Sequence, residues 1–191
     1  MPGMKNIAII CFLLISLHLF AQTTGKLTDS RDGKEYSTII IGNQRWMAEN
    51  LDYGTRINGS TNQTNNGQVE KYCYDNLESN CKTGGALYQW NEMMSYSAFP
   101  VNQGICPVGW HVPSDDEWKE LEIHLGMSEA DANLTGFRGT DQGTQLKSGG
   151  ASGFNATLDG YMTSPDTYLR GGEGNCFWTA TDIYARYLLD T

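Results

Sequence analysis

Basic residues are scarce in this sequence, with 13 Lys and Arg against 22 Asp and Glu, and the formal net charge is −9. Contacts with phosphate need a basic surface, so this scarcity argues against nucleic acid as a partner. Long apolar runs are missing after the first 20 residues, which excludes a polytopic membrane protein. Aromatic residues still make up 11% of the chain. They are enough to build a core, so we expect a folded globular domain rather than a disordered chain.

Residues that carry chemistry are also few. Beyond the first 21 residues there are only two histidines, His111 and His124, and their spacing does not suit a metal site. The sequence has no nucleotide-binding glycine motif and no repeat of fixed period. Cys106 and His111 are close enough in sequence for a Cys–His nucleophile, but export favours a disulfide at Cys106. We therefore expect no catalytic residue, no cofactor and no metal ligand.

The N-terminus has the pattern of a secretory signal peptide. Lys5 precedes the apolar run Ile7–Phe20, and the small residue Ala21 ends it. As a helix this run would be roughly 21 Å long, which is shorter than the ~30 Å hydrocarbon core of a bilayer. We expect residues 1–21 to be removed and the protein to be secreted, periplasmic or on the outer cell surface. An uncleaved N-terminal anchor is the alternative.

Four cysteines follow the signal peptide: Cys73, Cys81, Cys106 and Cys176. An even number in an exported chain predicts disulfides, here with three connectivities open. The polar, turn-forming segment after Cys73 favours Cys73–Cys81, together with Cys106–Cys176. In the chain-entropy model the two loops contribute about 2.5 and about 4 kcal/mol. Zinc is the rival interpretation, but Cys73 and Cys81 are too far apart for a metal knuckle.

Local patterns predict a small set of strands and helices. Residues 22–28 are expected to be a flexible leader, followed by a β-hairpin with strands at Glu35–Ile41 and Gln44–Ala48 around Gly42-Asn43. A capping box of Ser114 and Glu117 begins a helix in Pro113–Gly126. Further helices are expected at Gly85–Met94 and Met127–Leu134, with Ser128 as the N-cap of the second, and late strands at Phe177–Thr181 and Tyr184–Leu189.

Three polar loops are the expected contact surface, because loops can vary without disturbing the core. They are Gly54–Gln68, Asp75–Asn80 and Thr163–Asn175. The five tryptophans lie beside apolar neighbours, which favours core packing over a sugar-stacking platform. A calcium site is a further alternative in the glycine-rich loops, which hold the acidic residues Asp159, Asp166, Glu173 and Asp182.

Four ordered blocks carry a family resemblance. They are DGKEYSTIIIGNQRWMAENLDY, YCYDNLESNC with GGALYQWNEMM, GICPVGWHVPSDDEWKELE and FWTATD. Together they resemble the Fibrobacter succinogenes major paralogous domain, which occurs in exported bacterial proteins and has no established activity. The resemblance covers roughly residues 29–189, and we expect one such domain at 29–191. Members usually continue for about one or two more strands, so this domain is expected either to be truncated or to close its sheet differently.

The segment GWHVPSDDEWKELE is also similar to formylglycine-generating-enzyme-type domains, which have C-type-lectin-like folds. This similarity implies an α+β fold with a small twisted, mainly antiparallel sheet, two or three short helices and long glycine-rich loops. The expected function is a non-catalytic exported bacterial binding module for a glycan or protein ligand, without a membrane span after signal cleavage. The alternatives are a structural or assembly component of the cell envelope, and an enzyme of formylglycine-generating-like fold that lacks the reactive cysteine pair.

Overall fold

The computed structural model describes residues 23–97, 103–181 and 185–190. The predicted signal peptide at 1–21 lies outside these residues. Within the described ranges, none of the helices has the length and apolar character needed to cross a membrane.

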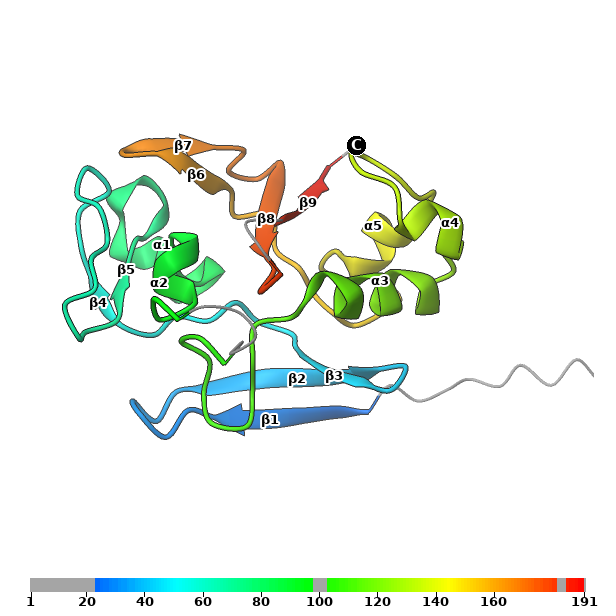
Figure 1. Ribbon diagram of the computed structural model, residues 1–191, viewed down its shortest axis with the longest axis horizontal. Helices are drawn as coiled ribbons and strands as arrows, with labels where there is room; N and C mark the ends of the chain where they lie inside the picture. The colour runs from blue at the N-terminus through cyan, green and yellow to red at the C-terminus, as the bar shows by residue number, and fades with distance from the viewer. Residues whose placement is uncertain (1–22, 98–102, 182–184, 191) are drawn as a thin grey trace, which may run out of the picture.

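The fold is α+β, with several small sheets and short helices (Figure 1). An antiparallel sheet of β1 (Thr24–Thr28), β2 (Glu35–Ile41) and β3 (Gln44–Met47) forms one side. The other strands are β4 (Thr55–Arg56), β5 (Glu70–Lys71), β6 (Tyr161–Ser164), β7 (Thr167–Leu169), β8 (Gly174–Trp178) and β9 (Ala185–Leu189). The α-helices are α1 (Glu78–Gly84), α2 (Trp90–Met93), α3 (Asp115–His124), α4 (Glu129–Ala132) and α5 (Gln142–Leu146).

Two groups of elements lie on the same side of the three-stranded sheet. Figure 1 shows β4, β5, α1 and α2 at one end and α3, α4 and α5 at the other, with β8 and β9 between them. The pairs β6–β7 and β8–β9 are antiparallel, whereas β4 and β5 pair in parallel. The apolar core follows this division, with one cluster beside α3 and a second around α2.

The prediction of a flexible leader at residues 22–28 is wrong for most of that segment. Residues Thr24–Thr28 form β1, which pairs antiparallel with the first five residues of β2, from Thr24 opposite Ile39 to Thr28 opposite Glu35. The other edge of β2 is occupied by β3, so β1 supplies partners for backbone groups that would otherwise face water. Lys26 Nζ also lies 2.6 Å from Glu35 Oε2 across the pair.

The predicted hairpin and the predicted capped helix are both confirmed. Gly42 has φ +61° at the turn between β2 and β3, a conformation that glycine adopts without strain. At the start of α3 the Ser114 side chain accepts from the Glu117 backbone, and the Glu117 side chain accepts from the Ser114 backbone. The cap at Ser128 is also present, because its hydroxyl accepts from Asp131 N at the start of α4.

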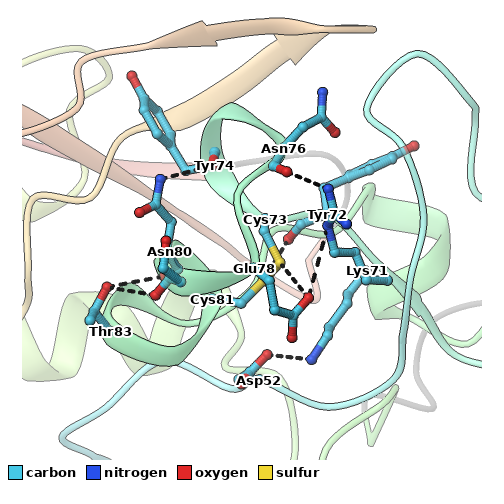
Figure 2. The surroundings of a disulfide bond; sticks show 12 residues. Asp52, Lys71, Tyr72, Cys73, Tyr74, Asn76, Glu78, Asn80, Cys81 and Thr83 are labelled. Atoms are coloured by element: carbon cyan, nitrogen blue, oxygen red, sulfur yellow. Dashed lines mark hydrogen bonds and ion pairs between the residues drawn. A yellow bond between two sulfur atoms is a disulfide. The ribbon is translucent and has the colours of Figure 1, made fainter.

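The disulfide between Cys73 and Cys81 is confirmed, with an S–S distance of 1.99 Å (Figure 2). The segment between these cysteines is not a simple turn, because it contains a 3-10 turn at Tyr74–Asn76 and the first residues of α1. The helix expected at Gly85–Met94 is shorter than predicted and is reduced to α2. Its first half is extended instead, since Leu87 forms a bridge with Tyr72.

Removing the Cys73–Cys81 disulfide is expected to destabilise the domain. The double substitution Cys73→Ser/Cys81→Ser should lower the free energy of unfolding by about 2.5 kcal/mol, because the unfolded chain regains the entropy that the small loop removes. Urea denaturation measures this loss. As the control, a reducing agent should destabilise the unsubstituted protein by a similar amount and leave the double variant unchanged. Equal stability of the two proteins under oxidising conditions would contradict the prediction.

Candidate functional site

A broad cleft of about 1440 Å³ lies between the three-stranded sheet and the elements opposite it. Its walls come from β3, the segment from α1 to α2, the chain before α3, β6 and the β8–β9 pair. These elements are far apart in the sequence, so the cleft exists only in the folded domain. Clefts that bring together apolar surface and a few polar groups are the usual location of ligand sites.

Half-buried and exposed aromatic side chains line this cleft. They include Trp90, Trp110, Trp178, Tyr161 and Tyr187. Trp178 Nε1 donates to Tyr88 O at 2.8 Å, and Trp90 Nε1 donates to Thr179 O at 2.9 Å. These bonds fix the two indole rings before any ligand arrives, which lowers the entropy cost of binding.

The tyrosines extend this aromatic surface onto the C-terminal strands. Tyr161 of β6 and Tyr187 of β9 have ring centroids 5.5 Å apart at 77°, in an edge-to-face arrangement. Tyr187 is 53% exposed. An exposed ring held at its edge by a second ring leaves its face free for an apolar surface, such as the C–H face of a sugar.

The five tryptophans therefore divide into two sets. Trp46 and Trp118 are buried, with centroids 4.9 Å apart, as the core interpretation predicted. All five contribute to the lining of the cleft, but Trp90, Trp110 and Trp178 are only half-buried, and Trp90 and Trp178 also pack against the second core cluster. These three half-buried rings are the ones that can present a surface to a ligand.

Side-chain amides supply the polar part of one wall. Gln89 N donates to Gln63 Oε1 at 2.6 Å, and Gln63 N donates to Gln89 Oε1 at 3.2 Å. Gln89 Nε2 also donates to Asn62 Oδ1 at 3.1 Å. This network joins the loop after β4 to the start of α2, and all three side chains line the cleft.

The structure brings the three expected contact loops together. These loops are Gly54–Gln68, Asp75–Asn80 and Thr163–Asn175. Asn76 Nδ2 donates to Asp166 Oδ1 at 2.5 Å, and Gly59 N donates to Asn76 Oδ1 at 2.7 Å. Asp166 N closes the set by donating to Gly59 O at 3.0 Å. Each loop thus bonds to the other two, and residues of all three line one end of the cleft.

Backbone conformation and aromatic packing support this loop contact. Asn76 and Asp166 both have positive φ, +55° and +57°, which Asn and Asp tolerate better than most residues. Beside them the Tyr74 and Tyr168 rings meet edge to face, 5.3 Å apart. Tyr74 also accepts a hydrogen bond from Gly171 N at its hydroxyl. The loops are therefore an ordered surface rather than independent segments.

The expected Cys106–Cys176 disulfide is not formed, and both residues are free thiols. The number of cysteines does not determine the distance between these two residues, because that distance depends on tertiary packing. Burial raises the pKa of Cys106 to about 12 and that of Cys176 to about 11. Both thiols are protonated at neutral pH, whereas a nucleophile must be a thiolate.

His111 does not act on Cys106 in the way that the Cys–His interpretation requires. Its Nε2 lies 2.7 Å from Glu117 Oε1, and Glu117 Oε2 accepts from Ser114. Burial alone would raise the pKa of Glu117, but the hydrogen bonds from Ser114 and His111 outweigh it and lower this pKa below its usual value. The imidazole therefore contacts Glu117 in the capping box of α3 rather than a thiol.

The described acidic residues that were considered as calcium ligands do not lie together. Asp166 bonds to Asn76, Glu173 pairs with Arg170 at 3.2 Å, and Asp182 lies outside the described residues. Asp159 lines the cleft. In the part of the chain that the structure describes, no three His, Cys, Asp or Glu residues are placed to hold a metal ion.

These features define a class: a small disulfide-bonded α+β domain with a cleft lined by aromatic and amide side chains. A model of the Fibrobacter succinogenes major domain matches residues 39–186, and the chain belongs to this family. The resemblance found in the four sequence blocks is thereby confirmed. No curated protein and no solved structure matches the chain.

The three loops were predicted from the sequence, but the cleft was not. Tyr161, Tyr187 and the amides of Gln63 and Gln89 were not singled out, because no local pattern marks them. The sequence offers one usable signal: aromatic residues alternate with glycine near the C-terminus, a pattern typical of ordered rather than disordered chain.

The substitution Asn76→Gly tests the loop contact. Glycine accepts the positive φ at this position but lacks the amide that joins Gly59 and Asp166, so backbone strain does not confuse the result. Amide hydrogen exchange should accelerate in both 54–68 and 163–175 and stay unchanged in the β2–β3 hairpin. If exchange rises only at residue 76 and its immediate neighbours, the three loops do not depend on this contact.

Proposed function

We propose that this protein is a non-catalytic exported bacterial binding module that takes a glycan ligand in the cleft. The observation that carries the proposal is the set of ordered aromatic rings beside amide side chains on one concave surface. Sugars present apolar C–H faces that stack on such rings and hydroxyls that bond to amides. A glycan without acidic groups also suits a chain with a net charge of −9, which disfavours acidic polymers.

Export and fold class form part of the same proposal. The signal-like N-terminus, the Cys73–Cys81 disulfide and the family's occurrence in exported proteins support secretion, the periplasm or the outer cell surface. We further propose a C-type-lectin-like arrangement, in which long loops around a small sheet carry the binding surface. The joined loops at Asn76 and Asp166 support it.

The substitution Tyr187→Ala tests the location of the ligand. Purified, processed and oxidised protein should bind at least one class of glycan on an array, and the variant should bind that glycan about tenfold more weakly, a loss of about 1.4 kcal/mol. Removing one exposed stacking ring accounts for a loss of this size. Isothermal titration calorimetry with the best glycan measures it.

Phe137→Ala is the matched control, because Phe137 is 80% exposed and does not line the cleft. It should bind like the unsubstituted protein. Equal binding by Tyr187→Ala would place the ligand elsewhere. Absence of binding to every glycan and cell-wall polymer would instead favour the envelope component, the alternative function.

A further inference from the structure

One carboxylate in the cleft, that of Asp159, has no ion-pair partner among the described residues. Asp159 is half-buried, lines the cleft and has its Oδ2 shielded from solvent. No described residue donates a hydrogen bond to this oxygen, and no described Lys, Arg or His forms an ion pair with the Asp159 carboxylate. A partly desolvated anion without a donor is costly, so such a group calls for a functional explanation.

The other charges that line the cleft are mostly compensated. Lys34 pairs with Asp52 at 2.7 Å, His111 contacts Glu117, and Glu49 accepts from Ser37 N at 2.9 Å. Lys82 and Arg45 also line the cleft without an ion-pair partner among the described residues, but both are exposed and their charges can remain hydrated. Asp159 therefore differs from its neighbours in being both partly buried and unpaired among the described residues.

The surroundings of Asp159 favour a positively charged partner. The side chain packs on Gly84, the last residue of α1, where a Cβ atom would lie only 2.4 Å from Asp159 Cγ. The C-terminal end of α1 adds little, because Gly84 O accepts from Asn50 Nδ2 and Lys82 lies in the last turn. The whole chain is acidic, with a net charge of −9. A cation gains from the carboxylate and from this net charge, whereas a neutral hydroxyl gains only a hydrogen bond.

We propose that Asp159 binds the protonated amino group of an amino sugar whose ring stacks on the aromatic side chains of the cleft. Tyr161 lies two residues along the chain and lines the same cleft, so the anion and an aromatic face are available to one ligand. This inference rests on the proposed glycan function and names the class of sugar. It predicts selectivity for a free ammonium over an acetylated amine or a hydroxyl at the same position.

Three β-1,4-linked hexamers test the selectivity, because they share one backbone and differ only at carbon 2. They are the hexamers of glucosamine, N-acetylglucosamine and glucose. Calorimetry at pH 6 and low salt should show the glucosamine hexamer binding at least tenfold more tightly than the other two. Raising the salt concentration should reduce this preference, since the extra interaction is between charges.

The variant Asp159→Asn removes the charge with almost no change of shape. It should lose the preference for glucosamine and keep the affinity for the glucose hexamer. Asp116→Asn is the control, because it removes the same charge from an exposed carboxylate of α3 outside the cleft, and it should keep the preference. Without ligand, Asp159→Asn should melt at a higher temperature than the unsubstituted protein, since a desolvated charge is gone.

Two failures can be told apart. If the glucose hexamer binds as tightly as the glucosamine hexamer, or Asp159→Asn keeps the preference, the role of Asp159 is overturned while the glycan function stands. If none of the three hexamers binds, the assignment of the amino sugar is overturned, and the array result decides whether the glycan function falls with it. A lower melting temperature for Asp159→Asn would show that the carboxylate stabilises the fold instead.

Discussion

Four aromatic rings from distant segments meet beneath the β2–β3 hairpin, and the remaining architecture depends on their contact. Trp46 of β3 lies 4.9 Å from Trp118 of α3, and Phe154 lies 5.7 and 5.8 Å from these two rings. Phe177 of β8 completes the set at 5.6 Å from Trp118. Pairs of strands such as β8 and β9 are marginal alone in water, so they need this shared apolar contact to persist.

The same contact leaves the cleft open. Large rings fill the space beside α3, while the second cluster around α2 is built from smaller groups such as Met94, Ile105 and Ala180. At the edge of the second cluster, Trp178 and Trp90 are held by hydrogen bonds to backbone carbonyls as well as by apolar packing. A rigid frame of this kind positions side chains for a ligand without requiring any of them to perform chemistry.

Features set by neighbouring residues were predictable from sequence, and features set by distant ones were not. The turn at Gly42 and the capping box of Ser114 and Glu117 involve residues within three positions, so their patterns were sufficient. Strand β1 forms because β2 has a free edge with which it can pair. Helix α1 begins inside the Cys73–Cys81 disulfide loop, whose residues favour turns. In both segments the amino-acid composition favours exposed, irregular chain, and no local pattern predicts the strand or the helix that forms.

The candidate site shows the same division. The loop regions were found because Asn, Gly and Thr mark exposed chain. The bonds that join Gly59 to Asn76 and Asn76 to Asp166 span 17 and 90 residues and have no sequence pattern. The pairing of Cys106 with Cys176 was wrong for a related reason, since an even cysteine count says nothing about distance. The cleft itself combines residues from Lys34 to Tyr187.

The central claim is that a preformed aromatic cleft receives a sugar while the core stays unchanged. The indole N–H signals of the five tryptophans, recorded by 15N-resolved NMR during titration with the glycan that binds best, test it most directly. Signals of Trp110 and Trp178 should move on binding, and those of Trp46 and Trp118 should stay fixed. A titration that moves only the two buried signals, or none of the five at saturation, would contradict the account.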